Sequence, residues 1–84
     1  MQNDEIKALI SAGIPGSQVD VAGDDGTHFE AIIVSDSFTG LNMVQQHQLV
    51  YKALGDKMGG EIHALSIQTY TPDEWEKKKL LRVI

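Results

Sequence analysis

Three histidines are the side chains of this chain best suited to chemistry near neutral pH, because imidazole changes charge there and also binds metals. They are His28, His47 and His63, and the 84-residue sequence contains no cysteine. The chain therefore has no disulfide, no thiol nucleophile and no all-cysteine metal site of its own. Any metal that it binds must be held by imidazole or carboxylate groups, unless a partner supplies sulfur.

Two of the histidines are predicted to stand near the start of strands. His63 is the third residue of the stretch EIHALSIQTY, residues 61–70, whose apolar and small residues predict a buried strand. His28 is the second residue of a predicted strand over residues 27–34. The crossover between these strands contains a helix, so it should be right-handed and lay the strands parallel. We therefore expect both imidazoles at one edge of the sheet. Taken singly, each is better explained as an ordinary strand residue, solvated or satisfied by backbone and water, and the pair is more informative than either member.

The first part of the chain predicts a helix followed by a hairpin. The helix begins with Asn3 as its cap and ends at Gly13. Val19 and Val21 alternate with polar residues and predict a half-buried strand. The turn signal Asp24-Asp25-Gly26 then leads into the strand over residues 27–34.

A second helix is predicted between Gly40 and Gly55. Four residues fall on one stripe of this helix and should face the core, namely Met43, His47, Val50 and Leu54. A histidine on such a stripe is usually a packed core residue, and we expect this of His47, over the middle of the sheet.

A third helix is predicted after Thr71-Pro72-Asp73-Glu74, which combines an N-cap, a proline at the first helical position and a glutamate three residues after the cap. Trp75 should anchor this helix to the sheet, although its indole is large enough to serve a partner surface instead. The basic run Lys77, Lys78 and Lys79 is an ordinary solvated helix face or, with Trp75, a candidate partner-binding surface.

The order α-β-β-α-β-α predicts an α+β fold, a single domain over residues 1–84 with helices on one face of a three-stranded mixed sheet. The composition, 42% hydrophobic and 23% charged, is that of an ordinary soluble globule. The sequence contains no stretch of roughly 18 apolar residues, the length needed to span a membrane. The opening MQNDEIKALI lacks the features of a secretory signal, so we expect a cytoplasmic protein.

The charge distribution argues against nucleic acid as the main ligand. The net charge is −5, and residues 1–40 contain seven acids and one base, while four bases lie in the last eight positions. Affinity for phosphate backbones comes largely from basic side chains. Gly13-Ile14-Pro15-Gly16 matches the GxxG motif of loops that clamp the nucleic-acid backbone. The end of the first helix explains these glycines better. The sequence contains nothing that resembles a nucleophile motif or a phosphate-binding loop, so it gives no indication of an enzyme.

The sequence resembles BolA-like proteins over essentially its whole length. The likeness lies in Phe38-Thr39-Gly40, in residues 46–51 (QHQLVY), and above all in residues 62–67 (IHALSI) followed by Thr71-Pro72-Asp73-Glu74-Trp75. The acidic turn with its histidine, residues 24–29, is most similar to the IbaG branch of that family. The resemblance implies a small sheet of the KH type II kind, in agreement with the predicted order of elements.

The resemblance also implies a partner rather than a reaction. BolA-like proteins associate with monothiol glutaredoxins, and the pair shares a [2Fe–2S] cluster to which the glutaredoxin cysteine and glutathione contribute sulfur. His63 and His28 match the family's histidine positions and would be the ligands from this chain. One departure is that the helix histidine, often flanked by arginines in the family, stands here between Gln46 and Gln48. That lowers the positive charge available for phosphate contacts.

Two other functions remain open from the sequence. The first is a DNA-binding transcriptional regulator that uses the KH-like fold and the basic C-terminal helix. The second is a homodimeric module that associates through the open face of its sheet without any metal.

Overall fold

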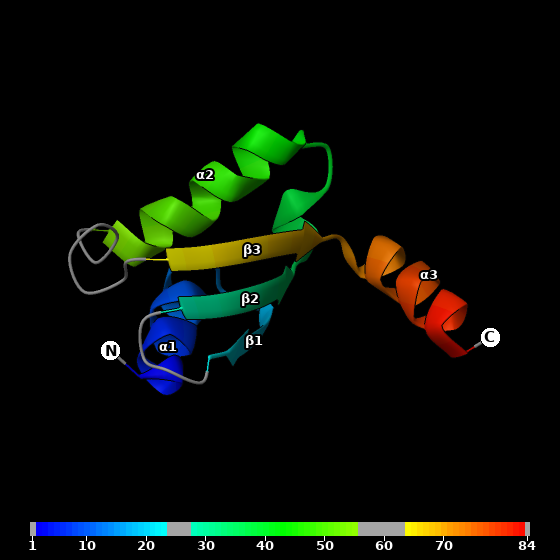
Figure 1. The fold of residues 1–84 in the computed structure, drawn as a ribbon. Helices are drawn as coiled ribbons and strands as arrows, with labels where there is room; N and C mark the ends of the chain where they lie inside the picture. The colour runs from blue at the N-terminus through cyan, green and yellow to red at the C-terminus, as the bar shows by residue number, and fades with distance from the viewer. Residues whose placement is uncertain (1, 24–27, 56–63, 84) are drawn as a thin grey trace.

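The computed structural model describes residues 2–23, 28–55 and 64–83, and for residues 81–83 it describes the backbone alone (Figure 1). The elements along the chain are α1 (Asn3–Gly13), β1 (Gln18–Ala22), β2 (His28–Val34), a 3-10 turn (Asp36–Phe38), α2 (Met43–Leu54), β3 (Ala64–Tyr70) and α3 (Pro72–Val83). The predicted α+β class and order of elements are confirmed.

The three strands form one mixed sheet in the order β1-β2-β3. β1 runs antiparallel to β2, with Val19 opposite Ile33, and β2 runs parallel to β3, with His28 opposite Ala64. The parallel pair confirms the prediction that the helix-containing crossover lays these two strands parallel. The predicted turn at Asp24-Asp25-Gly26 and the first residues of the predicted third strand, 61–63, lie outside the described residues.

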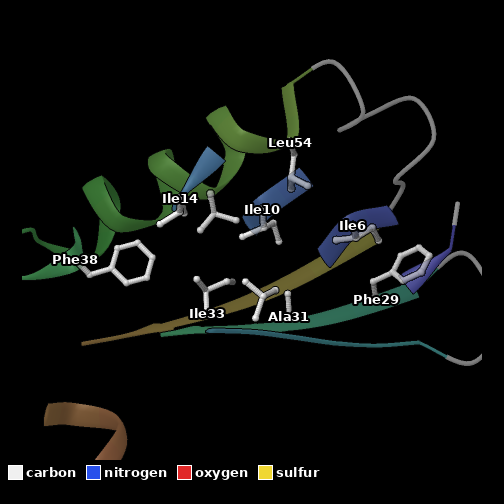
Figure 2. Packing of buried hydrophobic residues seen from close by; sticks show 10 residues of the cluster. Ile6, Ile10, Ile14, Phe29, Ala31, Ile33, Phe38 and Leu54 are labelled. Carbon is white, nitrogen blue, oxygen red and sulfur yellow. The ribbon is translucent and has the colours of Figure 1, made fainter. Parts of the chain in front are cut away.

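The core lies between the sheet and the two helices α1 and α2 (Figure 2). Alternate residues of β2, among them Phe29 and Ile33, point toward the helices, as the two-residue period of a strand requires. Ile6 and Ile10 of α1 are fully buried against them, because residues four apart share one face of a helix. Burial of each such side chain contributes about 1.5–3 kcal/mol.

The start of α1 differs from the prediction. Gln2, and not Asn3, stands at the cap position, and the backbone N–H of Gln2 donates to Oε1 of Glu5 at 3.2 Å. Asn3 is the first helical residue, and its side-chain amide instead lies 3.5 Å from the carbonyl oxygen of Gly23, at the end of β1. The prediction of Asn3 as cap is therefore wrong, because a tertiary contact to another segment competes with the local one.

Helix α1 ends at Gly13 as predicted, and the helix stop is also a packing position. A Cβ on Gly13 would collide with the Cβ of Ala53 on α2 and lie 2.8 Å from its Cα. The glycine thus allows the backbones of α1 and α2 to approach closely. The GxxG spelling is explained by this contact and by the helix stop together.

The apolar stripe predicted on α2 is partly wrong. Val50 and Leu54 are buried, but Met43 is 57% exposed and His47 is only partly buried. Gln46 takes the core position one turn before Val50, with 7% of its surface exposed. A polar side chain is tolerated there because its amide is hydrogen-bonded on both sides.

Strand β3 is an edge strand, and its burial reflects this position. Leu65 and Ile67 face the helices but are only half-buried, whereas Thr69 on the same face is 5% exposed. The prediction of a buried strand is therefore too strong for this segment. An edge strand has a neighbour on one side alone, so its side chains keep more contact with solvent.

Helix α3 begins with the predicted capping box. The N–H of Thr71 donates to Oε1 of Glu74 at 2.9 Å, and the N–H of Glu74 lies 3.3 Å from Oγ1 of Thr71. While α1 and α2 cover one face of the sheet, α3 continues beyond the end of β3 (Figure 1). Trp75 stacks on Tyr70 with 5.3 Å between ring centroids, which confirms that Trp75 anchors α3 to the sheet.

Candidate functional site

The shared rim of β2 and β3 is the place where the structure tests the predicted ligand pair. His28 is the first residue of β2, is exposed, and lies opposite Ala64 in the parallel register. Ala64 is the residue that follows His63 in the sequence. His63 itself lies outside the described residues, so its place at this rim stays a prediction.

A hollow of about 510 Å³ opens at this rim. It is lined by Ala22, Gly23, His28, Phe29, Glu30, Ala64 and Ser66. Small side chains on the two strands that flank β2 leave this space beside the larger residues of β2. His28 lines this hollow and is itself exposed to solvent.

Gly23 holds this corner of the sheet together. A Cβ at Gly23 would lie 2.7 Å from the carbonyl oxygen of His28 and 2.8 Å from the ring of Phe29. Such contacts are closer than a side chain tolerates, so only glycine lets the end of β1 approach the start of β2 this tightly. The backbone position of His28 therefore depends on Gly23, a residue that the sequence alone did not single out.

Among the described residues at the rim, His28 offers an imidazole that could serve as a metal ligand. The described ranges, 2–23, 28–55 and 64–83, contain no group of three or more histidine, cysteine or acidic side chains that could hold a metal ion. A [2Fe–2S] cluster is commonly held by four cysteines, and histidines replace two of them in some centres. His28 suits one such position, and the other ligands would have to come from outside the described residues or from a partner.

His47 does not join the rim. It lines a separate groove of about 360 Å³ between α2 and the second half of β3, together with Met43, Ile67, Gln68, Thr69 and Tyr70. This groove shares no residue with the hollow around His28. The expectation that His47 lies over the sheet is confirmed, and its groove is separate from the hollow that His28 lines.

The basic run of α3 is organised by an aromatic pair. Lys78 Nζ donates to the Tyr70 hydroxyl at 2.6 Å and lies 4.9 Å from the centroid of that ring. Lys79 Nζ lies 5.8 Å from the centroid of the Trp75 ring and 3.5 Å from a carboxylate oxygen of Glu76. Tyr70 is thus a central residue of this surface that sequence reasoning missed, because nothing in the sequence showed that Lys78 would fold back onto it.

The fold and these residues define a BolA-like protein. Residues 11–74 match the sequence model of the family described as BolA-like protein, and the chain belongs to that family. The acid stress protein IbaG of Escherichia coli strain K12 is 38% identical over 82 residues, which cover 96% of each chain. This likeness agrees with the resemblance to the IbaG branch.

Two further relatives show the range of the family. The structure of a BolA protein homologue from Coxiella burnetii superposes with a TM-score of 0.81 at 45% identity, over 90% of this chain and 97% of that one. A Vibrio cholerae protein named DNA-binding transcriptional regulator BolA is 45% identical over 51 residues, 61% of this chain and 48% of its own length. In the described part of the present chain, none of the helices has the length and apolarity needed to cross a membrane.

Proposed function

We propose that this protein is a non-enzymatic, cytoplasmic adaptor in iron–sulfur cluster assembly or trafficking. It works with a monothiol glutaredoxin, and the two proteins share a [2Fe–2S] cluster as cargo. His63 and His28 are the ligands that this chain contributes. The observation that carries the proposal is the pairing of His28 with Ala64, the neighbour of His63 in the sequence, at an open rim of the sheet.

The lack of cysteine explains why a partner is required. This chain offers imidazole and no thiolate, while a glutaredoxin cysteine and glutathione offer thiolate. Replacement of thiolate by imidazole on one iron raises the reduction potential of a [2Fe–2S] cluster. A cluster shared in this way would differ spectroscopically from a cluster that two glutaredoxins hold alone, and this difference can be measured.

Anaerobic reconstitution tests the proposal. The protein is mixed with a monothiol glutaredoxin, glutathione, iron and sulfide, and the visible absorption and circular dichroism of the mixture are recorded. We expect a band that differs from that of the glutaredoxin alone, and we expect His63→Ala to abolish the difference. His28→Ala should shift the spectrum or shorten the life of the cluster, since water or another group can replace a ligand at an exposed rim.

His47→Ala is the matched control, because this histidine lies in a separate groove. It should leave the spectrum unchanged. A His63→Ala protein that folds, binds the glutaredoxin and gives the unaltered wild-type spectrum would show that His63 is not a ligand. Circular dichroism in the far ultraviolet checks that each variant is folded.

A DNA-binding regulator is the second candidate, and the name of the Vibrio cholerae relative favours it. Against it stand the net charge of −5 and the engagement of Lys78 and Lys79 with the aromatic pair. A gel-shift series in increasing salt separates the two functions, because binding through lysines weakens steeply as salt rises. Tight, sequence-selective binding at physiological salt would favour the regulator.

A further inference from the structure

In the described part of the chain, α1 and α2 cover one face of the sheet, and the opposite face carries no helix along most of its length (Figure 2). This open face lies opposite α1 and α2, and its side chains are those that alternate with the core residues of each strand. Asp20, Ala22, Glu30, Ile32, Ser66 and Gln68 line a shallow hollow of about 160 Å³ on it. Ile32 is only partly buried there, and Asp20 and Glu30 are exposed.

Helix α3 lies on the same side of the sheet as this open face (Figure 2, orange ribbon). Its first turns contact β3 through Trp75 and Lys78, which both meet Tyr70. Farther along, Lys77 is exposed and Leu80 is 66% exposed. A helix of 12 residues is marginally stable in water on its own, because most helical stability comes from packing of one face. Packing of a partner against the exposed Lys77 and Leu80 would therefore stabilise α3.

The two surfaces are complementary in charge and in size. The open face is acidic through Asp20 and Glu30. The first half of α3 contains the acids Asp73, Glu74 and Glu76, and these are followed by Lys77, Lys78 and Lys79, of which Lys77 is exposed. A helix of 12 residues is about 18 Å long. A strand of 7 residues such as β2 is about 23 Å long. The helix is therefore shorter than the strand, so the open face is long enough to hold it.

We propose that a second copy of this chain covers the open face, with α3 of each copy lying across the sheet of the other. Lys77 of one copy faces Asp20 and Glu30 of the other, and Leu80 covers the partly buried Ile32. Each surface is present on both copies, so a two-fold axis satisfies both contacts at once. The occupant is a second copy because the same chain carries the acidic face and the exposed Lys77 and Leu80 that complement it.

Sedimentation velocity over a series of protein concentrations, without metal, glutathione or glutaredoxin, tests this proposal. The wild-type chain should shift from 9.2 kDa toward twice that mass as concentration rises. Asp20→Lys combined with Glu30→Lys should weaken self-association about tenfold or more, and Lys77→Glu should weaken it in the same direction, because each brings like charges together. Leu80→Ser should weaken it without any change of charge.

Mixing the two charge variants is the decisive arm. In a homodimer of either variant, the Asp20→Lys, Glu30→Lys protein or the Lys77→Glu protein, like charges meet. In a dimer of one variant with the other, opposite charges meet. The mixture should therefore recover association. Lys7→Glu on α1 carries the same change of charge on the far side of the core and should leave association at the wild-type level. A wild-type chain that stays monomeric, or charge variants that fail to rescue each other, would overturn the proposal.

This outcome is independent of the proposed cluster function. The experiment contains no iron or glutaredoxin, and none of its substitutions touches His28 or His63. The dimer can therefore fail while the adaptor function stands, and the reverse also holds. Added salt should weaken the dimer, since screening reduces attraction between exposed opposite charges.

Discussion

The hydroxyl of Thr69 on β3 donates a hydrogen bond of 2.6 Å to Oε1 of Gln46 on α2. The amide nitrogen of Gln46 in turn donates to the carbonyl oxygen of Leu41 at 2.9 Å. Gln46 and Thr69 are both buried, so neither group has water as a ready alternative. This chain of bonds joins the edge strand, α2 and the segment that leads into α2.

Removal of the Gln46 amide should destabilise the fold. Gln46→Ala leaves the Thr69 hydroxyl and the Leu41 carbonyl without their partner, and such a loss costs about 1–3 kcal/mol for a buried group. Urea unfolding measures this change in the free energy of unfolding. Gln48→Ala, two residues along the same helix at an exposed position, should change stability by less than about 0.5 kcal/mol. Equal losses in the two variants would contradict the role of Gln46.

The pair Gln46 and Thr69 also shows where sequence reasoning stops. Hydrophobic spacing on α2 predicts Met43 and His47 on the core stripe, because it treats glutamine as a surface residue. The structure buries Gln46 because its amide is satisfied by groups that arrive from β3 and from the preceding segment. Those partners are 5 and 23 residues away, so no local pattern shows them.

Local sequence patterns, in contrast, predicted the structure correctly where the contacts that determine it lie within a few residues. The capping box at Thr71 and Glu74 depends on groups three residues apart, and the structure has both of its bonds. Likewise, the parallel pairing of β2 and β3 follows from the crossover between them, whose helix returns the chain to the end of the sheet where β2 begins. Asn3 is the counterexample, because its side chain reaches Gly23 rather than its own helix.

At the candidate site, sequence predicted that the two strand starts share one edge but could not predict the register. The pairing of His28 with Ala64 is set by the whole of β2 and β3 packing on the core. The need for glycine at position 23 likewise arises from the close approach of the backbone and ring of β2. Neither contact leaves a signature in spacing or composition.

The close contact between α1 and α2 predicts a coupled pair of substitutions. Gly13→Ala places a methyl group against Ala53 and should cost about 1–3 kcal/mol, as overpacking of a core does. Ala53→Gly removes the opposing methyl group but leaves the contact with the Cα of residue 53 at 2.8 Å, so the double variant should recover only part of the loss. Urea unfolding of the two single variants and the double variant gives the coupling energy, and additive effects would show that the two sites do not touch.

Glu74 predicts a measurable dependence of α3 on pH. The backbone N–H of Thr71, and then its side chain, lower the pKa of Glu74 from its usual 4.5. A carboxylate with a lowered pKa in the folded state stabilises that state above its unfolded pKa, and the contribution is lost as pH falls through the folded value. The stability difference between wild type and Glu74→Gln should therefore shrink as pH falls below about 4.5.

Two measurements check this expectation. NMR titration of the Glu74 side-chain carboxyl should give a midpoint below 4.5. Thr71→Ala at neutral pH should lower the stability of α3 by about 0.5–2 kcal/mol, the usual cost of losing an N-cap. A Glu74 midpoint at or above the usual value would contradict the hydrogen bonds assigned to Thr71.

The contact between Tyr70 and Trp75 should be visible in fluorescence, since Trp75 is the only tryptophan of the chain. Tyr70→Ala removes the ring that lies 5.3 Å from the indole and the hydroxyl that Lys78 contacts. The indole should then become more exposed, with emission shifted to longer wavelength, and loss of such an aromatic pair costs about 0.5–1.5 kcal/mol. Tyr51→Ala, which removes the other tyrosine from an exposed position on α2, should leave the emission of Trp75 in place. If Tyr70→Ala also leaves it in place, α3 is held to the sheet by something other than this stack.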